Sequence, residues 1–214
     1  MKIGILGGGQ LGRMFIQNAL NYDDEFHVLD PNSDCSCAYI SHFSQGNFNN
    51  YEDVLAFGQD KDVISIEIEH VNVDALFELE KQGKKVIPNA EIIKTIQQKI
   101  LQKEFYKKHN IPSPDFEIFD GTSEEIKIKF PFVQKLNTGG YDGKGVQIIK
   151  NAEDLKNLWT EDSVLENLVD IDKELSIIIA KNENRYSRRW TIRKNVHSKC
   201  IKLRRSISRF RPQL

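Results

Sequence analysis

Short apolar runs alternate with amphipathic stretches through the first half of the chain. The runs have the length and β-branched content of strands, and they lie at 2–6, 26–29, 63–66 and 85–87. Between them, apolar residues recur at helical spacing over 11–20 and 73–81, and then over 89–109 as one broken helix or two consecutive helices. Strands that alternate with helices predict an α/β, Rossmann-like domain built on a parallel sheet.

The pattern changes after Ile111-Pro-Ser-Pro114. The two prolines end the helical stretch, so they predict a domain boundary between residues 111 and 112. Shorter strand-like runs follow at each end of 132–149, at 164–169 and at 174–179, with a helix near 152–158. We therefore expect a Rossmann-like domain over 1–111 and a smaller α+β domain over 112–184.

The segment 132–149 predicts a hairpin with a long mobile tip, because its two strand-like runs flank four glycines in eight residues. These glycines are Gly139, Gly140, Gly143 and Gly145. Glycines that reach positive φ let backbone N–H groups line a polyphosphate, and Lys135 and Lys144 add positive charge. No Walker motif is present in this stretch. The alternative is an ordinary flexible hairpin.

A second glycine cluster, Gly7-Gly-Gly-Gln-Leu-Gly12, follows the first strand and opens a helix. With Asp30 eighteen residues after its last glycine, it satisfies the dinucleotide fingerprint, so an NAD-dependent oxidoreductase is one candidate. However, any phosphate or carboxylate can occupy a helix N-terminus. The motif therefore supports a Rossmann-like start more strongly than it supports a nicotinamide cofactor.

Polar side chains also follow the strand at 63–66. Glu67, Glu69 and His70 stand at its carboxyl end, where open α/β sheets bind ligands. Strand alternation would put both carboxylates on one face, so they either meet a substrate or one caps the following helix. Further along, Lys99 and Lys103 share a helix face, as a solvated stripe or as an arm that reaches phosphates.

Composition excludes several classes of protein. The 214 residues contain no run of eighteen apolar residues and no signal peptide, so we expect neither a membrane partner nor export. Cys35, Cys37 and Cys200 are too few and too irregularly spaced for a disulfide framework or a zinc site. We expect reduced thiols and a cytoplasmic location.

Charge is distributed unevenly. All 31 acidic residues precede position 185, whereas residues 185–214 hold 11 of the 30 lysines and arginines, and Arg13 is the only arginine before them. This abrupt change in residue usage suggests an aberrant, frameshifted segment over 185–214. The alternative is a genuine basic arm that binds nucleic acid or anionic lipid. Sequencing the gene around the codons for Asn184 and Arg185 distinguishes the two.

Four motifs together carry a family resemblance. Gly7-Gly-Gly-Gln-Leu-Gly-Arg-Met14, Glu67-Ile-Glu-His-Val71, Thr138-Gly-Gly-Tyr-Asp-Gly-Lys-Gly145 and Asp172-Lys-Glu-Leu-Ser176 resemble the N5-carboxyaminoimidazole ribonucleotide synthetases of purine biosynthesis, which are ATP-grasp ligases. The resemblance covers residues 1 to about 184. It implies a pre-ATP-grasp domain followed by an ATP-grasp domain, and a reaction of 5-aminoimidazole ribonucleotide, bicarbonate and ATP through carboxyphosphate.

The resemblance also implies roles for single residues. It places Lys99 and Lys135 on the ATP phosphates and the adenine beside a backbone hinge. The implied ATP-binding residues are Lys99, Lys135, Gly140, Tyr141, Asp142, Gly143, Lys144, Gly145, Val146, Glu166, Asn167, Leu168, Val169 and Glu174. The implied ribonucleotide-binding residues are Gln10, Leu11, Glu67 and Tyr141, and the implied catalytic residues are Asp142 and Lys144.

The chain departs from the family after residue 184. The family's magnesium-ligating carboxylates have no counterpart that we identify in 185–214, so no metal ligand is assigned and the C-terminal ATP-grasp half is expected to be missing. We therefore expect Mg²⁺-ATP as cofactor of the intact family, which the resemblance makes a homodimer, but little ligase activity from this chain. A sister ATP-grasp enzyme acting on another ribonucleotide, such as glycinamide ribonucleotide, is a further alternative; Gln10 stands where that enzyme would have an acidic residue.

Overall fold

The computed structural model describes residues 1–122, 126–140, 144–173, 175–181 and 186–192. Its first unit is a five-stranded, wholly parallel sheet with the strand order β3-β2-β1-β4-β5. The strands are β1 (Lys2–Leu6), β2 (Glu25–Asp30), β3 (His42–Gln45), β4 (Val63–Ile66) and β5 (Lys85–Ile87). The helices between them are α1 (Gln10–Ala19), α2 (Tyr51–Gly58) and α3 (Val73–Lys81). The predicted Rossmann-like domain is confirmed.

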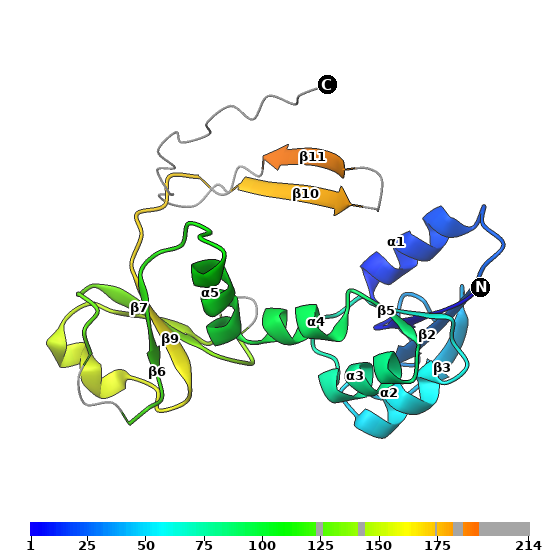
Figure 1. Cartoon of the computed structure of the whole chain (residues 1–214), viewed down its shortest axis with the longest axis horizontal. Coiled ribbons are helices and arrows are strands. Elements are labelled where there is room, and N and C mark those ends of the chain that lie inside the picture. The colour runs from blue at the N-terminus through cyan, green and yellow to red at the C-terminus, as the bar shows by residue number, and fades with distance from the viewer. Residues whose placement is uncertain (123–125, 141–143, 174, 182–185, 193–214) are drawn as a thin grey trace.

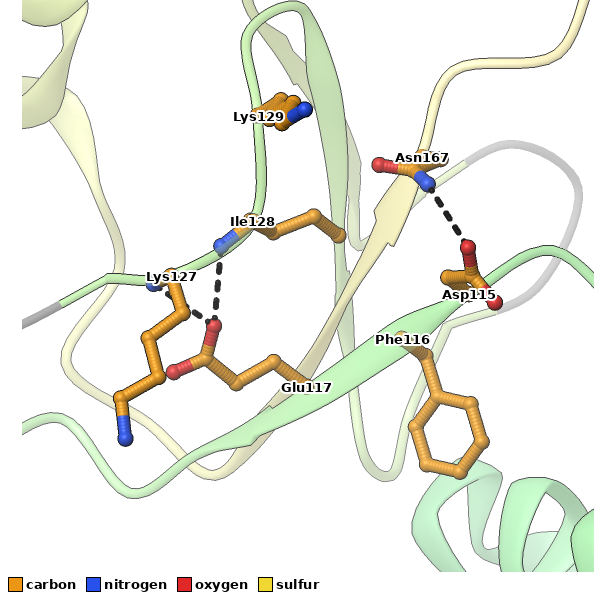
Figure 2. Close-up of a pocket in the computed structure, with 7 residues that line it drawn as sticks. All are labelled: Asp115, Phe116, Glu117, Lys127, Ile128, Lys129 and Asn167. Carbon is orange, nitrogen blue, oxygen red and sulfur yellow. Dashed lines mark hydrogen bonds between the residues drawn. The ribbon is translucent and has the colours of Figure 1, made fainter.

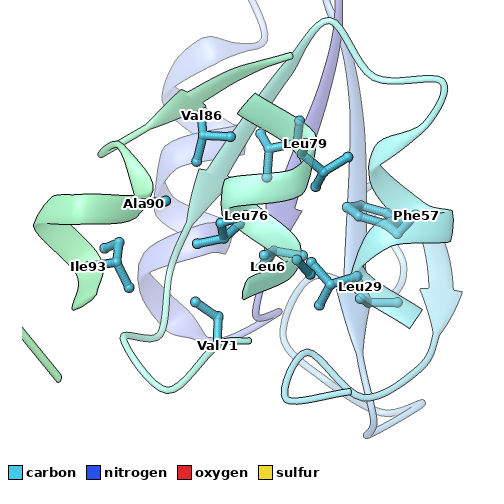
Figure 3. Close-up of a cluster of buried hydrophobic side chains, with 12 residues drawn as sticks. Leu6, Leu29, Phe57, Val71, Leu76, Leu79, Val86, Ala90 and Ile93 are labelled. Atoms are coloured by element: carbon cyan, nitrogen blue, oxygen red, sulfur yellow. The ribbon is translucent and has the colours of Figure 1, made fainter. Parts of the chain in front are cut away.

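Helices cover both faces of this sheet because consecutive residues of each strand point to opposite sides. Ile5 packs with Ile16 of α1 on one face, whereas Leu6 packs with α2 and α3 on the other. Figure 3 shows this second cluster, in which Leu76 and Leu79 of α3 face the sheet. Because each side chain of the cluster is buried, it fixes the strand ends that carry the polar residues described below.

Three asparagines set where the helices of this unit begin. Asn50, Asn72 and Asn89 each accept a hydrogen bond from the backbone N–H three residues later, at 2.9–3.0 Å. Such N-caps satisfy one of the otherwise unpaired donors in the first helical turn. α1 lacks a side-chain cap because its N-cap residue is Gly9. A group from elsewhere in the chain must therefore accept from its N-terminal N–H groups.

The stretch 89–109 forms two helices, α4 (Ala90–Gln97) and α5 (Lys99–Lys108). They are separated by Gln98, whose extended backbone (φ −117°, ψ 113°) interrupts the helical hydrogen bonds. Figure 1 shows α4 between the two sheets and α5 beside the second one. α5 contacts β9, although the predicted boundary at residue 111 assigns it to the first domain. That boundary stays a prediction.

The second unit is a four-stranded antiparallel sheet with the order β6-β9-β7-β8. Its strands are β6 (Phe116–Phe119), β7 (Phe132–Leu136), β8 (Val146–Ile149) and β9 (Ser163–Asn167), with a 3₁₀ helix over Ala152–Asn157. The predicted hairpin is therefore confirmed at both strands. Beyond it, β10 (Leu175–Lys181) and β11 (Tyr186–Ile192) pair in an antiparallel ribbon, so part of the basic segment forms a strand.

Alternation along β7 separates a core face from a cleft face. Phe132 packs in the core with Phe119, Ile149 and Leu165. Gln134 is also fully buried on the core side, where its amide donates to Trp159 O and Ser163 Oγ at 2.9 Å. Its Oε1 accepts from the Trp159 N–H and from Gln147. Val133 and Lys135 line the opposite face, which forms the candidate site.

The hydrophobic pattern did not reveal β3 or α2. β3 has a single large apolar residue, Phe43, and lies at the sheet edge, so it carries no alternating signal. α2 has Tyr51, Val54 and Leu55 at helical spacing, but with only eight residues it is too short for that pattern to stand out. Among the helices that the structure describes, none is long and apolar enough to cross a membrane.

Candidate functional site

A cleft of about 590 Å³ lies between α5 and the exposed face of the second sheet. Its walls combine aliphatic side chains of the sheet with three ammonium groups. The charged and polar lining residues are Lys99, Gln102, Lys103, Tyr106, Ser113, Lys135, Glu166 and Asn167. The apolar ones are Pro112, Pro114, Val133, Val146, Ile148, Val164, Leu168, Val169 and Ile171. An apolar slot with positive charge at one side suits a flat base that bears phosphates.

Glu166 joins two of these cations. It lies on the central strand β9 and is 5% exposed, and its two carboxylate oxygens form ion pairs with Lys103 of α5 and Lys135 of β7. Lys103 also donates to Ser113 Oγ at 2.7 Å. With two lysines on one carboxylate, the trio keeps one net positive charge, and Lys99 adds another. The cleft therefore attracts anions.

Opposing effects determine the pKa of Glu166. Burial raises it, but the hydrogen bonds and charges of Lys103 and Lys135 outweigh burial and hold the pKa below its usual range. The carboxylate therefore stays ionised at neutral pH. It fixes where the two ammonium groups lie, which leaves them positioned to meet phosphate oxygens.

Asn137 connects the glycine loop to α5. Its backbone carbonyl accepts from the Lys99 N–H at 2.9 Å, and its Oδ1 accepts from the Ile100 N–H at 3.0 Å. Asn137 thus caps α5 although it lies almost forty residues away in sequence. At the loop itself, Lys99 Nζ lies 3.5 Å from the carbonyl oxygen of Gly140. These contacts place the side chain of Lys99 at the base of the loop.

Two glycines of the loop confirm the predicted backbone conformation. Gly139 has φ +75° and Gly145 has φ +69°, values that favour glycine. The N–H of Leu136 donates to Gly145 O at 2.9 Å, so the loop is closed at its base. Lys144 follows the tip and Val146 begins β8. Tyr141, Asp142, Gly143 and Glu174 lie outside the described residues.

The hinge expected to read adenine runs from Glu166 to Val169. The Asn167 N–H donates to Asp115 O at 3.0 Å, and the Leu168 N–H donates to Pro131 O at 3.4 Å. Both N–H groups therefore already donate a hydrogen bond within the protein. An adenine would have to hydrogen-bond to backbone carbonyl oxygens of this hinge or to the N–H of Val169. Leu168 and Val169 are 44% and 37% exposed, which leaves apolar surface for a base.

A second pocket of about 540 Å³ lies at the β6 edge of this sheet (Figure 2). There the Glu117 carboxylate accepts the N–H groups of Lys127 and Ile128, at 3.0 and 3.2 Å. Asn167 borders both pockets and its side chain lies 3.5 Å from Asp115 Oδ2. Since Glu117 here accepts from backbone N–H groups, it does not join the lysines of this pocket, Lys127 and Lys129, as Glu166 joins Lys103 and Lys135.

In the first unit, the carboxylate of Glu67 lies against the glycine cluster, so the cluster is not an open phosphate site. Glu67 Oε1 accepts from the Leu11 N–H at 3.3 Å, and a Cβ built on Gly9 would lie 2.5 Å from the same oxygen. Glu67 therefore supplies the missing cap of α1. Asp30 is also occupied, because its Oδ2 accepts from the Gly8 N–H at 2.7 Å. A dinucleotide would have to displace both carboxylates.

The predicted ribonucleotide-binding residues of this unit come together. Gln10 and Leu11 are exposed in the first turn of α1, next to Glu67. Glu69 does not join them: β4 ends at Ile66, and Glu69 is exposed with an oxygen 3.8 Å from His70 Nε2. The expectation that strand alternation presents both carboxylates together is wrong, because the strand ends before them.

Magnesium does not fit the described part of the cleft. The one carboxylate among the described lining residues is Glu166, and both of its oxygens are paired with lysines. Mg²⁺ prefers carboxylates that are not neutralised, together with substrate phosphates. In the described cleft, lysine side chains supply the positive charge.

Family comparisons agree with both units. Residues 1–97 match the model of the ribonucleotide synthetase preATP-grasp domain, and residues 104–209 match the ATP-grasp domain. The second match extends across much of the basic segment, whose frameshift origin stays a prediction. The N5-carboxyaminoimidazole ribonucleotide synthase of Staphylococcus aureus is 33% identical over 210 residues, which cover 93% of this chain and 55% of that protein. The chain spans about half the length of most of the curated relatives that it matches.

Solved structures give the same result. The N5-carboxyaminoimidazole synthetase of S. aureus complexed with ADP superposes with a TM-score of 0.80 and 30% identity, over 90% of this chain and 55% of that one. The Aspergillus clavatus enzyme in complex with ADP and 5-aminoimidazole ribonucleotide gives 0.78 and 26%, over 92% and 55%. In sequence and in fold, the chain consists of a ribonucleotide synthetase preATP-grasp domain followed by an ATP-grasp domain, and over these residues it is similar to N5-carboxyaminoimidazole ribonucleotide synthetases.

Proposed function

We propose that the cleft between α5 and the second sheet binds ATP, and that the chain serves the ATP-dependent carboxylation of 5-aminoimidazole ribonucleotide. The observation that carries the proposal is the convergence of Lys99, Lys103 and Lys135 on one apolar cleft at the base of a glycine-rich hairpin. The relatives solved with ADP, and with ADP and the ribonucleotide, support it.

In the proposed reaction, a bicarbonate oxygen attacks the γ-phosphorus of ATP. The bond between the γ-phosphorus and its bridging oxygen breaks, and ADP leaves with that electron pair. The carboxyphosphate formed then transfers its carboxyl carbon to the ribonucleotide amine, and phosphate leaves. Because carboxyphosphate hydrolyses readily in water, a loop that closes over it has a clear purpose.

The residues of the cleft supply position and charge. Lys99 and Lys135 would bind the phosphate oxygens, and phosphoryl transfer depends on such positioning and neutralisation. Lys135 begins paired with Glu166, so phosphate has to share or replace that partner. Lys103 would then keep Glu166 neutralised while Lys135 turns to the nucleotide. Gly140, Gly145 and Val146 would contribute the loop backbone over the phosphates, with Tyr141, Asp142, Gly143 and Lys144 as further proposed contacts.

At the other site, Gln10, Leu11 and Glu67 would hold the ribonucleotide. Glu67 already lies against the start of α1, so it can accept from a substrate hydroxyl or amine without a large movement. Glu174 is proposed to accept from the ribose hydroxyls of ATP, and Asp142 and Lys144 are proposed to act on the reacting groups. Mg²⁺ ligands outside the described cleft, a homodimer and a cytoplasmic location stay predictions.

Nucleotide binding is the most direct test. Titration calorimetry of residues 1–214 with ADP or ATP should show saturable binding, and NADH should not compete. Lys135→Met should weaken binding by roughly tenfold to a hundredfold, the value of one charge-assisted hydrogen bond. Lys150→Met, an exposed lysine at the end of β8, is the matched control and should change little. Binding that tolerates Lys135→Met contradicts the proposed phosphate site.

Turnover is tested separately. Residues 1–214 are expected to release little phosphate from ATP when bicarbonate and the ribonucleotide are added, because the described cleft offers no magnesium carboxylate. Release that depends on the ribonucleotide would overturn this expectation while leaving nucleotide binding intact. Preferential thermal protection by NADH would instead revive the oxidoreductase alternative, which the occupied Asp30 and Glu67 disfavour.

A further inference from the structure

Two imidazoles and one carboxylate cluster at the amino-terminal end of the parallel sheet, at the opposite strand ends from the glycine cluster. The cluster consists of Glu25, His27 and His42, and one potential ligand atom from each lies within 4.8 Å of the others. Glu25 begins β2, whereas Asp30, which contacts the glycine cluster, ends it. Neither the nucleotide cleft nor the ribonucleotide site uses these three residues.

The backbone brings the three side chains together. His27 and His42 are register partners on the neighbouring parallel strands β2 and β3, and their rings stack with centroids 4.7 Å apart and planes 25° from parallel. Glu25 is two residues before His27 and therefore shares its face of the sheet. Its Oε2 lies 3.6 Å from His27 Nε2.

His27 has a ring nitrogen that can coordinate a metal. Its side chain is 15% exposed, and its Nε2 is buried and finds no hydrogen-bond partner in the part of the chain that the structure describes. A buried imidazole nitrogen without a hydrogen-bond partner is available to coordinate a metal.

The surrounding charge also permits a cation. Lys61 is the nearby positive group, but it is ion-paired with Asp60. The carboxylate of Glu25 then places a negative charge beside the two imidazole rings. Stacked histidines with no metal between them gain little from this arrangement, because His27 leaves a buried nitrogen unsatisfied.

We propose that Glu25, His27 and His42 bind one divalent transition-metal cation, with Zn²⁺ as the best match. Two imidazoles, one carboxylate and a water form a common four-coordinate zinc set, with metal–ligand distances of about 2.0–2.2 Å. The three ligand atoms lie within 4.8 Å of one another, so the side chains have to rotate to share one ion, and the 59% exposed Glu25 has room to do so. Mg²⁺ and Ca²⁺ are poor candidates because they prefer oxygen ligands.

The metal joins the edge strand β3 to β2. β3 has only four residues and little apolar content, so a bond from His42 to a shared ion would hold it in register. Because the folded state alone presents the three ligands together, binding also raises the melting temperature as the metal concentration increases.

Cobalt titration tests the site on untagged residues 1–214. One equivalent of Co²⁺ should give the visible absorption of a four-coordinate ion without a thiolate charge-transfer band, and Zn²⁺ should displace it. His42→Gln and His27→Gln should each weaken metal binding by at least about 100-fold. Loss of a group that only hydrogen-bonds to a metal ligand costs up to about that factor, so loss of a ligand itself should cost at least as much. His109→Gln, an exposed histidine of the α5 C-terminus, is the control and should bind normally.

Three results overturn the proposal: no stoichiometric binding, a thiolate band, or binding that survives His42→Gln. His42 is exposed on an edge strand, so this variant should keep the wild-type circular dichroism even if His27→Gln unfolds. ADP affinity should be the same with and without Zn²⁺. The outcome is therefore independent of the proposed nucleotide site.

Discussion

Asn137 Oδ1 accepts the Ile100 N–H at 3.0 Å, and this bond ties the end of β7 to the start of α5. It gives the first turn of α5 the cap that Gln98, the preceding residue, does not supply. Because Lys99 and Lys135 lie on the two elements that Asn137 joins, one amide sets the relative position of both proposed phosphate ligands.

Asn137→Ala should therefore affect both stability and binding. Loss of the cap should reduce the free energy of unfolding by about 1 kcal/mol. ADP affinity should fall as well, since Lys99 is no longer held at the loop. Asn151→Ala removes the equivalent side-chain cap of the 3₁₀ helix and serves as the control. It should lower stability without changing ADP affinity, and an equal loss of affinity in both variants would contradict the positioning role.

Glu166→Gln should destabilise the fold by roughly 3 kcal/mol at pH 7, because it leaves two largely buried lysines without their counter-charge. The pKa of Glu166 is lower in the folded state than the usual 4.5, so its stabilising contribution is present above pH 4.5 and is lost as the pH falls through the folded-state value. The difference between wild type and variant should thus shrink in acid. Urea unfolding from pH 7 to pH 3 measures it, with the exposed Glu161→Gln as a control expected to show no such trend.

Gly8→Ala should cost about 1–3 kcal/mol through overpacking. A Cβ at this position would lie 2.4 Å from Cys35 Sγ and 3.2 Å from Val28 Cγ1. The clash with sulfur predicts coupling, so Gly8→Ala should be less harmful in a Cys35→Ala background. Chemical denaturation of the four proteins in this cycle gives the coupling energy, and simple additivity would show that the sulfur is not the obstacle.

Cys37 should react slowly with alkylating reagents. Burial first, and then the neighbouring Cys35, Glu67 and Asp30, raise the pKa of its thiol from 9.0 to about 11. At pH 9 only about 1% of such a thiol is ionised, against half of an unperturbed one. Iodoacetamide labelling followed by peptide mapping should therefore show at least about fifty-fold slower modification of Cys37 in the folded protein than in urea. Comparable rates would mean that the glycine cluster opens readily.

Local signals predicted most of the fold. The strands Lys2–Leu6 and Val63–Ile66 begin and end where their apolar runs do, because both lie inside the sheet between helices, and the short edge strand Lys85–Ile87 buries only Val86. β3 was not predicted because an edge strand needs few apolar residues. Its position in the sheet is set by its pairing with β2. The prediction for Glu69 was wrong for a related reason, because the sequence does not show at which residue the hydrogen bonds of β4 end.

For the candidate site, residue types were easier to predict than contacts. Lys99 and Lys135 lie in one cleft as the resemblance implied, and Lys103 joins them as the arm that the helical spacing allowed. That Glu166 would pair with Lys103 and Lys135, and that Asn137 would cap α5, depend on strands and helices far apart in sequence. No local pattern encodes such pairs.

Core-facing and cleft-facing residues alternate strictly along β7, so a change in the length of this strand is more harmful than a substitution of one of its residues. Residues 132 and 134 point into the core while 133 and 135 point into the cleft. Inserting or deleting one residue within Phe132–Leu136 would exchange the two sets, driving an ammonium group among aromatic rings and turning Phe132 toward solvent. Substitutions along this strand should therefore be tolerated one by one, whereas a single-codon indel should abolish folding of the whole antiparallel sheet.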